Sequence, residues 1–221
     1  MMHDIHSHII YGVDDGAENL QQSLNMLDAA KAAGIDRIYA TPHMRSKDAD
    51  VESIYDHFAC LHQYAADRKI DLRLGFEYNI QAIDNDSFES AKDYTLAGTD
   101  ILLLEMPFTL WPPFWENIIY RLQGLQLRII IAHPERYEPI QKNPGIIKIL
   151  ADMGCFFQCN ASSVVKGSFK KNKVIRHLCK VGKLDFVASD AHSIYEYELY
   201  KKAVQKLSGK QNYLTIEDII N

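Results

Sequence analysis

Seven short apolar runs recur along the chain, and segments with helical spacing lie between them. Each run has the length of a buried strand, whereas the intervening segments place apolar residues three and four positions apart. The runs cover residues 2–5, 37–40, 72–75, 101–104, 128–132, 155–159 and 184–188. Strands that alternate with helices in this way predict a mainly parallel sheet with right-handed crossovers.

Seven strand–helix units suit a closed barrel better than a small open sheet. The ordinary eight-stranded α/β barrel has about 250 residues, whereas this chain has 221. A doubly wound sheet is the alternative, but no glycine-rich nucleotide loop follows the first run. No long repeat or Gly/Ser linker divides the sequence. We therefore expect residues 1–221 to form a single α/β domain, an irregular (β/α)7 TIM-like barrel.

The charge balance argues against a nucleic-acid-binding surface. Lys and Arg total 24 against 29 for Asp and Glu, which gives a formal net charge of -5, whereas nucleic-acid sites usually need a basic face. The N-terminus has no positive segment followed by an apolar one, and no apolar run approaches the length of a membrane span. We therefore expect no nucleic-acid partner, no membrane span and a cytoplasmic protein.

The cysteines do not point to thiolate chemistry. Cys60, Cys155, Cys159 and Cys179 form no CxxC pair, so buried small hydrophobic residues are the favoured interpretation. None of them is followed by an arginine six positions later, so the phosphate loop of cysteine-dependent phosphatases is absent. If the protein removes phosphate, it does so without a thiolate.

Residues that can bind metals follow nearly every apolar run. The carboxyl ends of parallel barrel strands meet on one face, where such barrels hold their active sites. Side chains from six separate strand ends would rarely agree in this way by chance. The nine residues that we expect to meet there are His6, His8, Asp15, His43, Glu77, Glu105, His133, Asp190 and His192.

Each of these residues also has a structural interpretation when it is taken alone. Alternate-residue histidines are often surface residues, His43 could belong to a loop, and a carboxylate after a strand could be a solvated cap. Asp190 and His192 repeat the spacing of His6 and His8, which places both members of each pair on one face of a strand and favours binding. The remaining histidines that we expect to be structural are His3, His57, His62 and His177.

Nine convergent groups exceed what one metal ion requires, since about four ligands saturate zinc. Mixed imidazole and carboxylate sets suit manganese, iron or zinc. We therefore expect two to three divalent transition metals that share bridging carboxylates. Clusters of this kind generate hydroxide at neutral pH and clamp both oxygens of an in-line phosphoryl displacement.

Taken together, the motifs resemble those of the polymerase and histidinol phosphatase (PHP) superfamily. They are HSH at 6–8, GVDDG at 12–16, TPH at 41–43, the isolated Glu77 and Glu105, HPERY at 133–137 and SDAH at 189–192. More narrowly, the sequence is similar to the bacterial manganese-dependent protein tyrosine phosphatases associated with capsule and exopolysaccharide operons. The resemblance extends from about residue 2 to residue 192 and includes Gln158 and Asn160.

The resemblance implies three metal positions, with manganese as the first choice. The first metal would take His6, His8, Glu77 and Asp190, the second Asp15, His43 and His192, and the third Glu105 and His133, with Glu77 bridging back to the first. By the same resemblance, Arg136 is the catalytic residue outside the metal ligands. Its guanidinium would hold the phosphate as a fork.

The sequence departs from that family at one position. Members usually carry a second phosphate-binding arginine shortly after the SDxH motif, whereas no arginine follows Arg176 here. Arg45, Lys201 and Lys202 are the candidates to replace it.

A rigid aromatic segment at 111–115 follows the strand that ends in Glu105. We expect Trp111 to contact the substrate, because an aromatic surface near the barrel mouth could stack on a phosphorylated ring. Loop packing and an oligomer contact are the alternatives.

The expected function is hydrolysis of a phosphomonoester, with protein phosphotyrosine as the first-choice substrate. Metal-bound hydroxide would attack phosphorus, and tyrosinate could leave with little proton donation because the pKa of a phenol is about 10. The alternatives are a histidinol-phosphate or sugar-phosphate phosphatase on the same scaffold and a metal-bound regulatory protein with little turnover. The resemblance implies a phosphotyrosine protein as partner, with the tail of a bacterial tyrosine kinase among the candidates, and self-association of the chain is left open.

Overall fold

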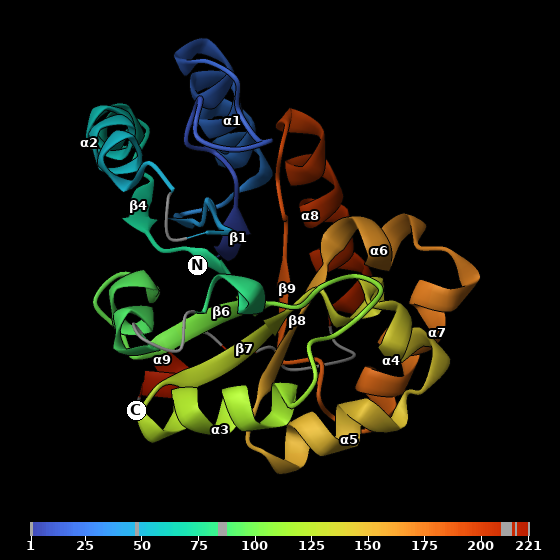
Figure 1. Cartoon of the computed structure of the whole chain (residues 1–221). Coiled ribbons are helices and arrows are strands. Elements are labelled where there is room, and N and C mark those ends of the chain that lie inside the picture. Colours follow the sequence, from blue (N-terminus) through green and yellow to red (C-terminus); the bar gives the residue numbers. More distant parts are fainter. Residues whose placement is uncertain (1, 47–48, 84–87, 209–213, 215, 221) are drawn as a thin grey trace.

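The computed structural model describes residues 2–220 apart from 47–48, 84–87, 209–213 and 215, and it contains a ring of short parallel strands surrounded by helices (Figure 1). The strands are β1 (His3–Ser7), β2 (Arg37–Ala40), β3 (His43–Met44), β4 (Asp71–Leu74), β5 (Glu77–Asn79), β6 (Ile101–Glu105), β7 (Arg128–Ala132), β8 (Phe156–Asn160) and β9 (Phe186–Ala188). Every pair of neighbouring strands in the two sheets is parallel.

The two sheets together make a closed barrel. One sheet has the order β1-β2-β4 and the other β3-β5-β6-β7-β8-β9. Only two residues separate β2 from β3 and β4 from β5, so each of these pairs occupies one position in the barrel. The ring closes between β1 and β9, where Ser7 pairs with Ala191 and the Asp190 amide donates to the His6 carbonyl at 2.9 Å. The result is seven barrel positions, which confirms the predicted (β/α)7 TIM-like fold.

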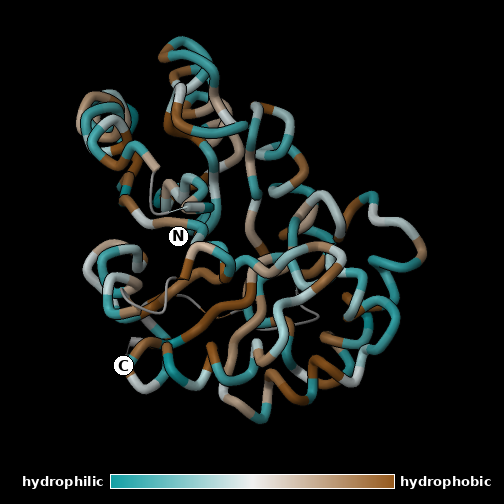
Figure 2. The backbone as a smooth tube through the Cα atoms, in the orientation of Figure 1, coloured by the Kyte–Doolittle hydropathy of each residue, from teal (hydrophilic) through white to brown (hydrophobic). Residues whose placement is uncertain are grey.

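Helices cover the outside of the strands. They are α1 (Leu20–Ala33), α2 (Val51–Asp67), α3 (Trp115–Gly124), α4 (Glu138–Lys142), α5 (Gly145–Asp152), α6 (Ala161–Lys166), α7 (Phe169–Lys180), α8 (Ile194–Leu207) and α9 (Ile216–Ile220), with short 3-10 turns η1 (Ile80–Ala82), η2 (Phe88–Tyr94) and η3 (Pro134–Arg136). Figure 2 shows the hydrophobic colour along the central strands and hydrophilic colour on the outer turns of the helices. Among the described helices, none has the length and apolar content to cross a membrane.

The barrel interior is apolar at one end. Ile5, Leu103 and Phe186 belong to an inner cluster that also contains Ile216 and Ile219 of α9. The segment before α9 is held near the start of β9, because the amide of residue 214 donates to the carbonyl of residue 185 at 3.0 Å. Helix α9 therefore lies at the amino ends of the strands, and the carboxyl ends are left to polar side chains.

Candidate metal centre

All nine metal-binding candidates predicted from the strand ends lie together at the carboxyl end of the barrel. They are His6 on β1 and His8 directly after it, Asp15 in the loop that follows, His43 on β3, Glu77 on β5, Glu105 on β6, His133 after β7, and Asp190 and His192 after β9. The convergence of these side chains follows from the parallel order of the strands. Binding of a metal by each individual residue stays a prediction.

Four groups of these side chains have a geometry suited to a metal ion. Within each group, one ligand atom per residue lies within 4.8 Å of the others. The groups are His8 with Asp15, His43 and His192; His6 with His8 and Asp190; His6 with Glu77 and His133; and His43 with Glu77 and Glu105. Each group shares one residue with the next, so the four form a closed ring. Ions in neighbouring groups would share ligands, as they do in multinuclear centres.

Glu77 lies at the middle of this ring, because four imidazoles contact it. Its Oε2 lies 3.4 Å from Nε2 of His6 and of His8 and 2.8 Å from Nδ1 of His43, and its Oε1 lies 2.7 Å from Nε2 of His133. Burial opposes the charge of this carboxylate, but the imidazoles, His6 first, outweigh burial and hold the pKa of Glu77 well below its ordinary value. Glu77 therefore stays ionised and can bridge two cations.

The protonation of the buried imidazoles reflects the surrounding carboxylates. Burial opposes a charge on His6, but Glu77 and Asp190 outweigh it and raise the pKa of His6 to about 9. For His8, hydrogen bonds to carboxylates, Asp14 first, outweigh burial and raise the pKa well above its ordinary value. A metal that binds one of these rings must displace the proton from the coordinating nitrogen.

The donor atoms of His6 and His8 fit a shared cation. Their Nε2 atoms face each other at 3.1 Å. The opposite nitrogen of each ring faces an acceptor, Gln158 Oε1 at 2.9 Å for His6 and Asp14 Oδ2 at 2.7 Å for His8. Neutral rings held in this way direct two lone pairs at one another, and a cation between them relieves that repulsion. The imidazole and carboxylate donors of the whole set suit manganese, iron or zinc.

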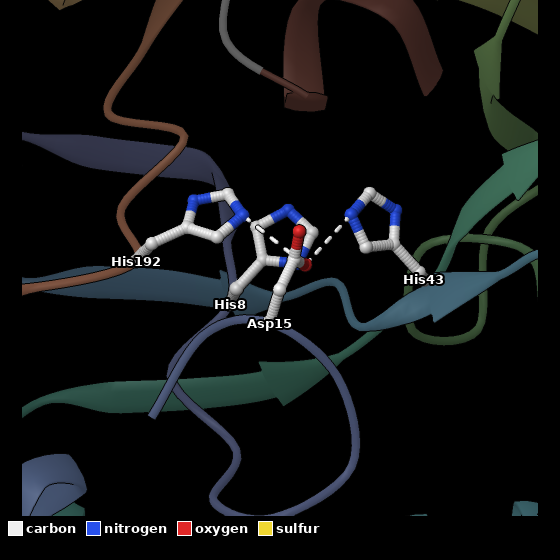
Figure 3. Close-up of side chains that lie close together, drawn as sticks. All are labelled: His8, Asp15, His43 and His192. Carbon is white, nitrogen blue, oxygen red and sulfur yellow. Dashed lines mark ion pairs between the residues drawn. The ribbon is translucent and has the colours of Figure 1, made fainter. Parts of the chain in front are cut away.

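The group that contains Asp15 lies at the open side of the centre. Figure 3 shows its four side chains, with Asp15 between His43 and His192. Asp15 Oδ1 lies 3.1 Å from Nε2 of His43 and 3.5 Å from Nε2 of His192. The Asp15 side chain is 58% exposed, whereas His8 beneath it is buried. Burial first, and then the neighbouring His8, lower the pKa of His192, which favours the neutral ring that a metal requires. This group is therefore the part of the centre most exposed to solvent.

Two of the proposed ligands have an unusual backbone conformation. His133 has a φ of 29° and Asp190 a φ of 51°, both in the left-handed region that L-residues rarely adopt. Each residue follows the end of a strand, β7 or β9, so the turn redirects the chain where a side chain must enter the centre. Conformations of this kind concentrate at functional sites, where the surrounding structure holds them.

Arg136 lies beside the centre and remains partly accessible. Its Nη1 donates to Asp190 Oδ2 at 3.0 Å, and its side chain is 33% exposed. The guanidinium lies 4.6 Å from the centre of the Phe108 ring, which in turn stacks on His133 at 5.8 Å. Arg136 is therefore held between a proposed ligand and an aromatic ring, with donors left for an anion.

The three candidates for a second phosphate-binding side chain lie in different places. Arg45 Nη2 is 2.5 Å from Nε2 of His43 and 3.9 Å from Asp15 Oδ2, so it adjoins the open group. Lys201 and Lys202 line a groove between α1 and α8. Of these three residues, Arg45 is the one that contacts the centre.

Trp111 lies within the loop after β6 and is only 9% exposed. Its ring packs edge-on against Trp115 at 5.0 Å and Tyr137 at 5.8 Å. The accessible rings of the loop are Phe108, 39% exposed, and Phe114, 74% exposed. Contact of Trp111 with a substrate stays a prediction, whereas its packing supports the loop that presents Phe108.

Asp14 is a site residue to which the sequence reasoning gave no role. Its Oδ2 lies 2.7 Å from Nδ1 of His8 and accepts from the His43 amide at 3.1 Å, and its Oδ1 accepts from the Gly16 amide at 2.9 Å. Burial opposes its charge, but the interaction with His8 outweighs burial and lowers the pKa of Asp14 to about 2. Asp14 therefore fixes which His8 nitrogen faces the centre. Its place next to Asp15 in the DDG motif is the signal that could have indicated it.

Comparison with known proteins identifies the family of this chain. The family model described as capsular polysaccharide synthesis, CpsB/CapC, matches residues 2–219. The chain is 32% identical over 204 residues to the tyrosine-protein phosphatase YwqE of Bacillus subtilis (strain 168), covering 87% of this chain and 78% of YwqE. A crystal structure from the pair YwqE of Bacillus subtilis and CpsB of Streptococcus pneumoniae, described as metal-dependent tyrosine phosphatases, gives a TM-score of 0.81 at 27% identity over 96% of both chains. The lactonase Lmo2620 from Listeria monocytogenes covers 92% of this chain and 82% of its own at 14% identity, and its TM-score of 0.52 reflects the fold alone. The chain therefore belongs to the CpsB/CapC family of capsular polysaccharide synthesis.

Proposed function

We propose that this chain is a metal-dependent protein tyrosine phosphatase whose nine clustered residues hold two to three divalent transition metals, manganese first. The observation that carries the proposal is the closed ring of four ligand groups with Arg136 beside it. A ring that shares His6, His8, His43 and Glu77 between groups supports neighbouring ions. The relatives named as tyrosine-protein phosphatases support phosphotyrosine as the substrate.

Divalent metals bound by this donor set supply a nucleophile from water at neutral pH and offset negative charge on phosphoryl oxygens. The side chains of the chain then orient the substrate. Arg136 offers a planar guanidinium that can donate two parallel hydrogen bonds to a phosphate. Phe108, which lies under that guanidinium, offers an accessible ring beside the position of the phosphate.

The leaving group favours an aryl phosphate. A phenol has a pKa of about 10, so tyrosinate departs with little help from an acid, whereas an alkoxide requires a proton donor. The cationic side chains that contact the centre among the described residues, Arg136 and Arg45, are guanidinium groups, which do not give up protons in proteins. The residues around the centre therefore suit phosphotyrosine better than an alkyl phosphate.

We expect manganese-loaded protein to hydrolyse a phosphotyrosine peptide with a higher kcat/KM than histidinol phosphate. Initial rates on both substrates, measured with one protein preparation, test this preference. A preference for histidinol phosphate or a sugar phosphate would favour a small-molecule phosphatase on the same scaffold. A metal-replete protein that turns over neither substrate would favour a regulatory protein.

We expect each chain to bind at least two, and up to three, transition-metal ions. The four ligand groups extend over nine residues, and neighbouring groups share a ligand, so one ion cannot occupy them all. Elemental analysis of the purified protein gives the stoichiometry, and anomalous scattering from crystals gives the positions. One ion bound by four residues would contradict the multinuclear centre.

We further propose that residues 1–221 act as one domain, a proposal supported by a family match that extends over residues 2–219. Manganese as the native metal and the tail of a bacterial tyrosine kinase as the substrate stay predictions. So do the cytoplasmic location and self-association of the chain.

A further inference from the structure

Strand β8 contributes none of the nine proposed ligands, yet it ends in two buried amides, Gln158 and Asn160. They lie two positions apart on one strand, the same spacing as His6 and His8. A buried amide must satisfy both its donor and its acceptor atoms, so the partners of these two side chains constrain what they do. Both make hydrogen bonds to proposed ligands.

The two amides form one continuous hydrogen-bonded chain between His6 and Asp190. His6 Nδ1 lies 2.9 Å from Gln158 Oε1, Gln158 Nε2 donates to Asn160 Oδ1 at 3.0 Å, and Asn160 Nδ2 donates to Asp190 Oδ2 at 2.5 Å. The four groups come from β1, β8 and the loop after β9. We refer to the Gln158–Asn160 pair as the amide bridge.

The direction of donation along the amide bridge is fixed at both ends. The His133 backbone amide can only donate, and it approaches Gln158 Oε1 at 3.4 Å, so that atom is an acceptor. At the other end Asp190 Oδ2 faces the Arg136 guanidinium, which has donors and no acceptor, so this oxygen accepts from Asn160 as well. In the neutral His6 ring that binds a metal, the proton therefore lies on Nδ1, and Nε2 is the lone-pair atom turned to the centre.

The amide bridge also selects the oxygen that Asp190 presents. Asp190 Oδ2 accepts from both Asn160 and Arg136, whereas Oδ1 lies 3.3 Å from Nε2 of His6 and 3.3 Å from Nε2 of His8. These are the members of one of the four ligand groups. A backbone contact holds the amide bridge in place, because the backbone N–H of Asn160 donates to the buried Glu135 carboxylate at 3.0 Å.

We propose that Gln158 and Asn160 are positioning residues that set the donor atoms of His6 and Asp190 for one metal ion, an inference that rests on the proposed metal-dependent function. Outer hydrogen-bond partners of this kind orient metal-binding imidazoles and carboxylates, and their loss commonly weakens metal affinity by about 10- to 100-fold. β8 thus acts on the centre without contacting an ion.

The test compares two substitutions of the same kind. Gln158→Met removes the amide at nearly constant volume, which leaves His6 without its acceptor and Asn160 without its donor. Gln123→Met is the matched control, because Gln123 Nε2 donates to the Met153 carbonyl at 2.6 Å near the start of β8, at the other end of the barrel. The affinity of each metal-free protein for Mn²⁺ is measured by calorimetric titration, and its thermal unfolding is measured separately.

We expect Gln158→Met to bind Mn²⁺ about 10- to 100-fold more weakly than the wild-type chain, and Gln123→Met to bind like the wild type. The two metal-free variants should unfold at similar temperatures. Unchanged Mn²⁺ affinity in Gln158→Met would overturn the inference and leave the proposed function standing, even if the variant were less stable. A wild-type chain that binds no Mn²⁺ would contradict both this inference and the proposed metal-dependent function.

Asn160→Leu provides the same test from the other end of the amide bridge. If Gln158→Met does not fold, weaker Mn²⁺ binding by folded Asn160→Leu supports the inference, and wild-type binding overturns it. Failure of both variants to fold would also overturn it, because the amides would then maintain the barrel rather than position ligands.

Discussion

We expect a strong chelator to abolish phosphotyrosine hydrolysis by this protein and added Mn²⁺ to restore it. The carboxylates around His6 and His8 raise the pKa of both imidazoles against the effect of burial, so protons and metal ions compete for these rings. Chelation removes the ions that would activate water at neutral pH. Initial rates and metal content, measured before chelation, after it and after addition of Mn²⁺, check this expectation. Full activity in a metal-free sample would contradict it.

Alkylation of the cysteine thiols, unlike chelation, should not affect the rate of hydrolysis. Cys60 and Cys179 are partly exposed, and Cys155 and Cys159 are buried. Burial raises the pKa of both buried thiols, to about 12 for Cys155, which keeps them protonated and unreactive. We therefore expect alkylation, checked by mass spectrometry at Cys60 and Cys179, to leave the rate unchanged. Loss of turnover with the metals retained would indicate a thiol in the mechanism.

The barrel was predictable because its strands are apolar and separated by helices. The runs at 37–40 and 128–132 coincide with β2 and β7. Strands β3 and β5 were not predicted, because they have two and three residues and carry His43 and Glu77 in place of an apolar pattern. The last run was expected from residue 184, whereas β9 begins at 186. At residue 185 the contact with β8 is made by a side chain rather than by the backbone, because the Asp185 carboxylate accepts from the backbone N–H of Phe157 at 2.9 Å.

The convergence of the nine side chains was predictable, whereas their distribution among metals stays a prediction. Each candidate follows an apolar run, and a parallel barrel brings such positions to one face. The resemblance assigned Glu105 and His133 to one metal, and Nε2 of His133 lies 4.0 Å from Oε1 of Glu105, so that assignment stays a prediction. His8 was assigned to the first metal with His6 and Asp190, and these three residues form one group in the structure, but His8 also adjoins Asp15, His43 and His192. Strand order does not specify which side chains meet across the barrel, because side-chain rotamers and turns decide those distances.

Loop conformation limited the prediction of substrate contacts. Trp111 was expected to contact the substrate, because it belongs to an aromatic segment that follows the strand ending in Glu105. The orientation of its loop depends instead on Tyr137, whose hydroxyl accepts from the Met106 amide at 2.9 Å and whose ring packs against Trp111. Such a contact joins segments 31 residues apart, and no local pattern indicates it. Phe108 was missed for the same reason.

Replacement of Arg136 by alanine should lower kcat/KM for a phosphotyrosine peptide by on the order of a hundredfold, with metal content intact. Loss of one preorganised donor to a transition state commonly costs about 3 kcal/mol. Arg136 offers such a donor set, because its hydrogen bond among the described residues uses Nη1 alone and its side chain is 33% exposed. Arg136→Lys should restore little activity, since an ammonium group cannot make two parallel bonds. Steady-state kinetics on metal-replete variants measures both effects.

Arg128 offers a matched control for this prediction. It lies at the start of β7, its side chain is 36% exposed, and it donates to Asp100 at 2.9 Å, much as Arg136 donates to Asp190 at 3.0 Å. Loss of a structural ion pair should lower the melting temperature of either alanine variant to a similar extent, but only Arg136→Ala should lose turnover. If Arg136→Ala is stable, metal-replete and nearly as active as the wild type, Arg136 has no part in catalysis. Arg45 would then be the phosphate anchor, because it contacts the open group of the centre.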